Sequence, residues 1–246
     1  MTLLRDSGVV LRTYRLGEAD RIVVLVTEAH GKVRAVAKGV RKTTSKWGAR
    51  LEPLSHVALL LWKGRSDLAV VSQAEVIDHF PELRGDLDRV ASGLSMLEVV
   101  DQLAQEDHPD PGLYRMLVGA LRVLADLGTD PVMVAPAFFL RALAHEGAEP
   151  VLYACAACGR PEGDVELVAF DLTEGGSLCR QCRRGRAVSA DVLEVVRALL
   201  GGALGKVLAA PPPACAGEVA SLATEAMEGH VDRRLRAVHT AAGLTW

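Results

Sequence analysis

The stretch RIVVLVTEAHGKVRAVAK, residues 21–38, decides the fold of this chain. It holds two short runs rich in β-branched residues, joined by the turn signal Ala29-His30-Gly31. In the second run apolar and basic residues alternate, which is the two-residue period of a strand with one buried face. The apolar side consists of Val33, Ala35 and Ala37, and the basic side of Lys32, Arg34 and Lys38.

Three more runs of the same kind surround this pair, at residues 8–14, 57–62 and 68–77. Five short strands within about 75 residues predict a small barrel, and the OB-fold is a five-stranded, partly open barrel that binds oligonucleotides. An SH3-like barrel would give a similar strand pattern, so the strand count alone leaves both open. Trp62 closes the apolar run VALLLW, and we expect it in the barrel core.

After Pro81 the apolar residues recur at helical spacing. We predict helices over residues 83–107, 113–127, 132–145, 189–200 and 217–241, with a linker or turn at Gly201-Gly202 and at residues 209–213. The helices on either side of residues 150–187 are expected to pack together, which makes that segment an insertion. The predicted fold class is α+β: an OB-fold domain at residues 1–80 and a helical domain at 81–246, with a zinc module at about 150–187.

Two Cys-x-x-Cys pairs, Cys155/Cys158 and Cys179/Cys182, lie within the inserted segment. Such a pair turns both thiolates toward one point, and two pairs complete a tetrahedron around Zn²⁺. Residues 165–179 between the pairs are expected to form a hairpin. Four thiolates leave no open coordination position, so one structural zinc is predicted. A redox pair is the alternative, but the βαβ context of such motifs is missing. Cys215 is expected to be a free thiol.

Basic residues concentrate around the opening stretch. Residues 1–70 carry thirteen Lys and Arg against six Asp and Glu, whereas residues 71–246 carry fifteen against twenty-five. From Gly31 to Arg50 there are seven basic residues and no acidic one. A strand leading into a basic loop suits a polyanion such as nucleic acid, and a solvated surface loop is the other interpretation. Tyr14 and Trp47 are candidates for stacking on bases.

The sequence contains no complete copy of the common catalytic motifs. Residues 201–206 resemble a phosphate-binding loop, but the spacing is too short and Val207 stands where Ser or Thr should bind Mg²⁺. His145-Glu146 lacks the second histidine of a zinc protease. We therefore expect a binding protein and not an enzyme. No signal peptide or membrane span is evident, and a cytoplasmic, nucleoid-associated protein is expected.

Residues 5–77 closely resemble the bacterial recombination mediator family RecO, most specifically in RLGEADRIV (residues 15–23) and in AxGVRK…SxxGARLEP (residues 37–53). The helical region, its four-cysteine module and the chain length are similar to the zinc-containing members. The resemblance implies an OB-fold followed by a helical domain with a zinc module. It also implies binding of single- and double-stranded DNA, annealing of complementary strands, and action with RecR to replace SSB by RecA on single-stranded DNA.

The resemblance assigns DNA contact to the basic residues of the matched segment, to which the stacking candidate Trp47 is added. The DNA-binding set is Lys32, Arg34, Lys38, Arg41, Lys42, Lys46, Trp47 and Arg50. The family also docks the acidic, hydrophobic C-terminal tail of SSB in a basic-rimmed groove of the helical domain. Candidates for that contact are Arg115, Arg122 and Arg141, and each can equally extend a cationic head group from the core into water.

Two other classes of protein stay open on the residues alone. One is a zinc-ribbon factor of transcription or translation whose barrel grips RNA. The other is a hydrolase or transferase whose site has no recognisable motif.

Overall fold

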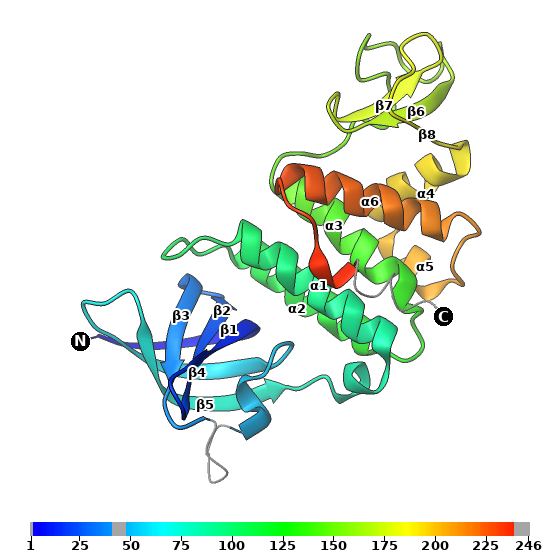
Figure 1. Cartoon of the computed structure of the whole chain (residues 1–246). Coiled ribbons are helices and arrows are strands. Elements are labelled where there is room, and N and C mark those ends of the chain that lie inside the picture. Colours follow the sequence, from blue (N-terminus) through cyan, green and yellow to red (C-terminus); the bar gives the residue numbers. More distant parts are fainter. Residues whose placement is uncertain (1, 41–47, 239–246) are drawn as a thin grey trace. The chain divides into compact units, whose positions relative to one another are not determined.

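The computed structural model describes residues 2–40 and 48–238 of the chain (Figure 1). These residues fall into two compact units. The first comprises the described residues up to Asp126 together with residues 236–238, and the second comprises Leu127–Leu235. Each unit is described by itself.

Five strands of the first unit form a closed barrel: β1 (Thr2–Leu16), β2 (Asp20–Thr27), β3 (Gly31–Ala37), β4 (His56–Lys63) and β5 (Ala69–Asp78). The order around the barrel is β1-β2-β3-β5-β4, and β1 closes it by pairing with β4 as well as with β2. The β3–β5 pairing is parallel, with Ala35 opposite Ala69, and the other pairings are antiparallel. This five-stranded barrel confirms the predicted OB-fold.

The barrel interior is filled by the alternate residues of each strand. Val10, Val23, Leu25, Ala35 and Leu61 are among its buried side chains. The strand β1 can serve two neighbours because its register shifts between Val10 and Arg12, where a bulge bends it. The 3₁₀ helix η1 (Gly48–Leu51) adds Leu51 to the same core.

Trp62 was expected inside the barrel, and that expectation is wrong. Its neighbours Leu59 and Leu61 point inward, so the strand alternation turns Trp62 outward, where it is 41% exposed. The run of apolar letters hid this alternation, because outward positions of β4 also carry apolar residues.

Two helices complete the first unit: α1 (Leu87–Leu103) and α2 (Pro111–Ala125). The first was predicted to begin at Leu83, but η2 (Pro81–Gly85) precedes it. The separation lies at Asp86, whose backbone is extended and whose carboxylate accepts hydrogen bonds from the first turn of α1. Asp110 caps α2 in the same way. The buried Arg89 of α1 donates hydrogen bonds to the carbonyls of Leu124 and Asp126, which satisfies the end of α2.

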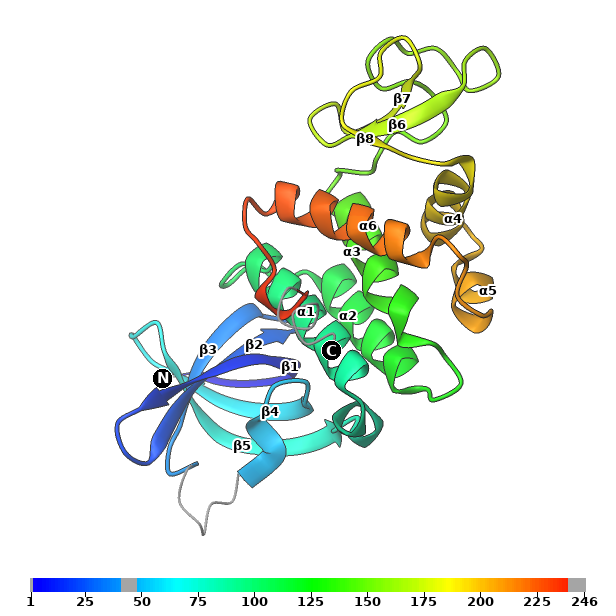
Figure 2. The same ribbon diagram turned by 45° about the vertical axis from the view of Figure 1, so that its right-hand side comes forward.

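The second unit holds the remaining elements. They are η3 (Pro131–Met133), α3 (Val134–His145), β6 (Leu167–Asp171), β7 (Gly176–Cys179), β8 (Arg186–Ala187), α4 (Ala190–Leu200), α5 (Leu204–Ala209) and α6 (Ala216–His230). The helix α3, before the cysteine segment, packs against α4 and α6, which follow it (Figures 1 and 2). The expected packing of the helices that flank the insertion is confirmed.

Two boundaries in this unit differ from the prediction. The short helix α5 was not predicted and lies between the two segments expected as linkers or turns, and α6 ends at His230 instead of near residue 241. The chain turns at Asp232, which has a φ of 49°, so the helix cannot continue. The hairpin predicted between the cysteine pairs is confirmed as β6 and β7, and β8 adds a third strand.

The predicted domain boundary at residue 80 stays a prediction. In the structure α1 and α2 belong to the same compact unit as the barrel, and the helices from α3 onward belong to the other. No helix within residues 2–40 and 48–238 is long and apolar enough to span a membrane.

Candidate metal centre and candidate nucleic-acid interface

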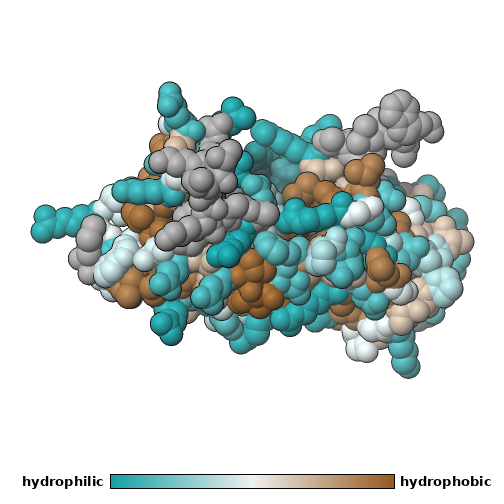
Figure 3. Space-filling view, turned by 90° about the horizontal axis from the view of Figure 1, so that it is seen from below, coloured by the Kyte–Doolittle hydropathy of each residue, from teal (hydrophilic) through white to brown (hydrophobic). Residues whose placement is uncertain are grey.

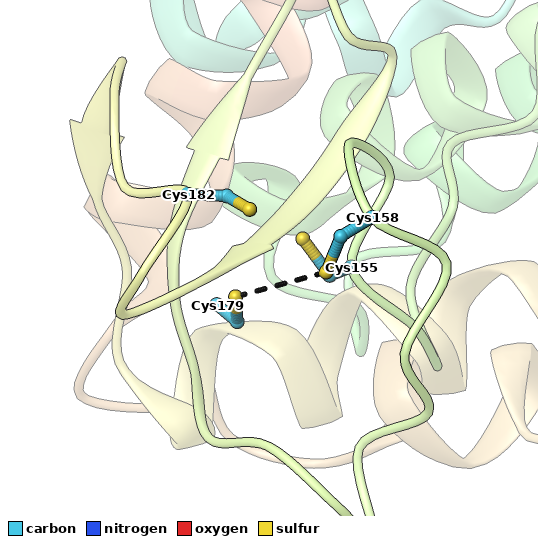
Figure 4. Close-up of side chains that lie close together, drawn as sticks. All are labelled: Cys155, Cys158, Cys179 and Cys182. Atoms are coloured by element: carbon cyan, nitrogen blue, oxygen red, sulfur yellow. Dashed lines mark hydrogen bonds between the residues drawn. The ribbon is translucent and has the colours of Figure 1, made fainter.

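The four predicted cysteine ligands come together in the second unit (Figure 4). Their sulfur atoms all lie within 4.8 Å of one another, and the Sγ atoms of Cys158 and Cys179 are 4.0 Å apart. A tetrahedral ZnS₄ site with Zn–S bonds of about 2.3 Å has sulfur–sulfur edges of about 3.8 Å. The cysteines are therefore already arranged as a zinc site requires, with soft thiolate ligands and near-tetrahedral spacing.

Backbone hydrogen bonds hold each cysteine pair in its turn. The amide of Gly159 donates to the Cys155 carbonyl at 2.8 Å, and Gly159 has a φ of 73°, which favours glycine. The amide of Cys182 donates to the Cys179 carbonyl at 3.1 Å. The amide of Ala156 donates to the Ser177 carbonyl at 2.8 Å, which links the two turns. Backbone hydrogen bonds therefore fix the positions of the cysteines.

The backbone also favours a thiolate at one ligand. Burial raises the pKa of the Cys155 thiol, but hydrogen bonds with the backbone of Cys179, Cys158 and Ala157 lower it to about 6. Hydrogen bonds with the thiols of Cys179 and Cys158 raise the pKa of Cys182 to about 12. Cysteine binds a metal ion as the thiolate. The positive charge of the ion therefore has to lower the pKa of Cys182 when the ion binds.

Arg197 of α4 connects the cysteine segment to the helices of its unit. Its guanidinium donates to the Leu152 carbonyl, lies 2.8 Å from a Glu162 carboxylate oxygen and sits 4.7 Å from the centre of the Tyr153 ring. Cys215, at the start of α6, is half-buried and lies outside the four-cysteine cluster. Burial raises its pKa, so its thiol stays protonated near neutral pH.

The predicted DNA-binding residues fall into two groups. Lys32, Arg34, Lys38 and Arg50 are described, whereas Arg41, Lys42, Lys46 and Trp47 lie outside the described residues. Arg34, Lys38 and Arg50 are exposed; Arg34 lies on the outer face of β3, and Lys38 is the first residue after that strand. The described part of the set therefore offers exposed cations on the barrel, and the DNA contacts themselves stay a prediction.

Lys32 differs from the others because it is only 17% exposed. Its ammonium group donates to the Asp101 carbonyl at 2.6 Å and lies 3.7 Å from the Asp101 carboxylate. Arg34 lies 3.8 Å from the Glu106 carboxylate. Two of the predicted phosphate contacts are thus already paired with acidic side chains of the α1–α2 region.

Other cations on the barrel surface were missed by sequence reasoning. Lys63 ends β4, and Arg65 follows in the β4–β5 loop, which is a region that OB-folds use to bind oligonucleotides. Arg12 lies over the ring of Tyr14, 5.1 Å from its centre, and both are exposed on β1. Lys63 and Arg65 belong to no basic run in the sequence. They could have been found only by locating the β4–β5 loop first and then looking for cations at it.

Exposed apolar side chains are distributed over the surface. Tyr14 and Trp62 are 45% and 41% exposed on the barrel. On the face drawn in Figure 3, hydrophobic residues form patches separated by hydrophilic ones. Single exposed apolar residues of this kind are normal on protein surfaces, so the two aromatic residues are notable only because they sit among cations.

The three candidates for the SSB tail do not share one compact unit. Arg115 and Arg122 are exposed on α2 in the first unit, and Arg141 is half-buried on α3 in the second. Arg115 lies 3.8 Å from the Glu28 carboxylate. Their role stays a prediction.

The arginines near the second cysteine pair are largely engaged within the unit. Arg180 pairs with Glu166, Arg184 with Glu174 and Arg186 with Glu225. These pairs place an acidic side chain beside each of the three cations.

A closed five-stranded barrel with an exposed basic strand, joined to helices that carry a Cys₄ centre, defines the class of OB-fold nucleic-acid-binding proteins with a metal module. Comparison with known families specifies it further. Residues 1–80 match the family model described as "Recombination protein O N terminal", and residues 84–238 match "Recombination protein O C terminal". The chain therefore belongs to the RecO family of recombination mediators. This places it in DNA repair and recombination as a DNA-binding protein.

Proposed function

We propose that this protein binds single- and double-stranded DNA, anneals complementary strands and, with RecR, helps to load RecA onto DNA covered by SSB, without catalysing a chemical reaction itself. The observation that carries the proposal is the family match across both parts of the chain. The exposed cations on the barrel support it, because phosphate contacts supply affinity without reading sequence.

The DNA-binding surface in this proposal is the outer face of β3 and the basic loop after it. Lys38 and Arg50 are the exposed, described members, and Arg34 contributes when its pairing with Glu106 opens. Arg41, Lys42, Lys46 and Trp47 extend the surface outside the described residues. Lys32 contributes least, because it is mostly buried and bonded to Asp101.

The cysteine centre supports the function by holding one Zn²⁺ in a structural role. Four thiolates fill the tetrahedral coordination sphere, so the ion has no position at which to activate a substrate. We expect the three-stranded sheet beside it to lose stability without the metal, because the binding free energy of structural zinc contributes to the folding of small modules.

The test is annealing of complementary DNA strands that are coated with SSB, with and without RecR. We expect annealing by the unmodified protein and its loss in the variant Lys38→Glu with Arg41→Glu, while circular dichroism and the thermal midpoint show an intact fold. Normal annealing by a folded double variant would contradict the assignment of this surface. A charge-reversed pair elsewhere on the barrel, Arg5→Glu with Arg15→Glu, controls for the change in net charge.

Partners are tested separately from DNA. Binding of a peptide with the acidic, hydrophobic character of the SSB tail should weaken when Arg115, Arg122 or Arg141 is replaced by alanine, if that residue contributes to its groove. Equal binding by all three variants would remove these residues from the proposal without affecting DNA binding. Competition between RNA and single-stranded DNA at fixed salt distinguishes the RNA-binding alternative, which the family match does not favour.

A further inference from the structure

The connection between α1 and α2 lies along the edge of β3. The amide of Lys32 donates to the Gln105 carbonyl at 2.9 Å, and Glu106 forms bridges with Gly31 and Lys32. Gly31 has a φ of 67°, and a Cβ there would lie 2.3 Å from the His108 carbonyl oxygen. The connection is therefore fixed against the barrel by backbone contacts, at a position where only glycine leaves room.

This connection presents two carboxylates to cations of the barrel. Glu106 lies 3.8 Å from Arg34 of β3, and Asp107 forms a hydrogen-bonded ion pair with Lys63 of β4. The hydrogen bond and charge of Lys63 lower the pKa of Asp107, so that carboxylate is ionised at neutral pH. All four side chains are at least one-third exposed, and ion pairs as exposed as these are weak and easily exchanged.

The two ion pairs border a cavity of about 150 Å³. It lies between β3 and the β4–β5 loop, and four cations line it: Lys32, Arg34, Lys63 and Arg65. Asp67 is a third acidic residue in the lining, with Glu106 and Asp107. A concave site with cations next to the β4–β5 loop is where an OB-fold can bind the backbone of an oligonucleotide.

We propose that Glu106 and Asp107 stand in for two backbone phosphates of nucleic acid on Arg34 and Lys63, and that the DNA backbone displaces them when it binds beside the β4–β5 loop. The inference rests on the proposed DNA binding by the barrel and adds Lys63 and Arg65 to its surface. Carboxylate and phosphate oxygens accept the same charge-assisted hydrogen bonds from guanidinium and ammonium groups, so one can replace the other. The acidic pair thus limits affinity, and unbound protein keeps these cations neutralised.

The alternative is that the ion pairs only hold the connection against the barrel. In that case removing the carboxylates changes stability, and DNA affinity responds to net charge alone. The two explanations differ in the salt dependence of binding. Each cation that contacts a phosphate contributes about 0.7 to the slope of log K against log salt for single-stranded DNA, so under the proposal replacing Arg34 and Lys63 with alanine makes that slope shallower by about 1.4.

The experiment compares the full chain with the variant Glu106→Gln and Asp107→Asn, in which Asn keeps the left-handed backbone of Asp107 (φ 59°) at little cost. The probe is a labelled oligothymidylate, followed by fluorescence anisotropy over a series of salt concentrations. We expect the variant to bind about three- to tenfold more tightly at low salt, with a similar slope, because Arg34 and Lys63 contact phosphate in both proteins. The control, Glu75→Gln with Glu82→Gln, changes net charge equally at exposed residues outside the cavity lining.

Replacing Arg34 and Lys63 with alanine provides the second arm. If the proposal holds, this replacement weakens binding more in the Glu106→Gln, Asp107→Asn background than in the unmodified chain. Equal affinity for the variant and the charge control would overturn the inference while DNA binding itself stands. If the unmodified chain does not bind the oligonucleotide at all, the proposed function fails, and this inference fails with it.

Discussion

The guanidinium of Arg12 lies 3.0 Å from the carboxylate of Asp101, which joins β1 of the barrel to the last turn of α1. Asp101 is only 6% exposed, and the ammonium group of Lys32 of β3 lies 3.7 Å from the same carboxylate. A carboxylate at the C-terminal end of a helix opposes the helix dipole, so this position is favourable only because two cations face it. Asp101 therefore connects two barrel strands to one helix end.

Replacing Asp101 with Asn should destabilise the first unit by about 1–3 kcal/mol, because it leaves Lys32 and Arg12 without their buried counter-charge. The estimate lies below that for a fully buried pair, since Arg12 is 46% exposed and partly screened by water. Urea unfolding measures the change. Asp88→Asn, on the exposed first turn of the same helix, should cost much less, and equal losses for the two variants would contradict the role given to Asp101.

The proposed zinc centre predicts a clear separation among the cysteines. Cys179→Ser should lose the metal and unfold its module, because structural zinc contributes on the order of several kcal/mol to the stability of small domains. Cys215→Ser should retain one zinc per chain, since Cys215 lies outside the cluster. Elemental analysis and thermal unfolding measure both. A purified protein without metal, and as stable as the zinc-loaded one, would refute the structural role.

The cysteine cluster could be predicted from the sequence, whereas the contact of Asp101 with Arg12 could not. The four cysteines were predictable because two residues separate the members of each pair, and such local spacing survives into the structure. The strands were predictable for the same reason, since alternation is local. The contact of Asp101 with Arg12 joins residues far apart in the chain, so no local sequence pattern predicts it.

The same distinction applies to the candidate DNA surface. The basic strand β3 is visible in the sequence, but the carboxylates that face it come from the connection between α1 and α2. Trp62 was misplaced because an apolar run does not reveal which of its members point outward. The end of α6 at His230 depends on the left-handed turn at Asp232, which composition alone does not indicate.

His56 makes the first unit sensitive to pH. Its Nε2 lies 2.7 Å from the Tyr114 hydroxyl, and the side chain is buried between β4 and α2. Burial lowers the pKa of His56, and the positive charge of Arg122 lowers it further, against an opposing effect of Asp78. The unfolded chain therefore binds a proton more readily, so this contribution to stability is complete above pH 6.5 and decreases as the pH falls below it.

We expect the thermal midpoint of the unmodified protein to fall more steeply between pH 7 and pH 5 than that of His56→Gln. Burial raises the pKa of Tyr114 to about 12, so its hydroxyl stays protonated throughout this range and does not contribute to the slope. Tyr114→Phe should cost about 1 kcal/mol at neutral pH by leaving the imidazole without its hydrogen bond. If the thermal midpoints of the unmodified protein and of His56→Gln fall in parallel with pH, His56 is not responsible for the pH dependence of stability.

Gly31 gives the sharpest test of how the connection between α1 and α2 is seated. Ala at this position meets two penalties: a left-handed backbone with φ 67°, and a Cβ 2.3 Å from the His108 carbonyl oxygen and 2.6 Å from that of Gln105. The Gln105 carbonyl accepts a hydrogen bond from the Lys32 amide, so it cannot move without breaking this bond to β3. We expect Gly31→Ala to destabilise the first unit by about 2–4 kcal/mol, measured by urea unfolding.

Gly17 separates the two penalties, because its φ of 57° is similar and a Cβ there meets nothing within 4 Å. Gly17→Ala should therefore cost only the backbone term, about 1 kcal/mol. The difference between the two variants measures the contact of β3 with the connection that carries Glu106 and Asp107. If both substitutions cost the same, the connection is not held against the barrel edge in solution, and the two carboxylates do not occupy fixed positions on Arg34 and Lys63.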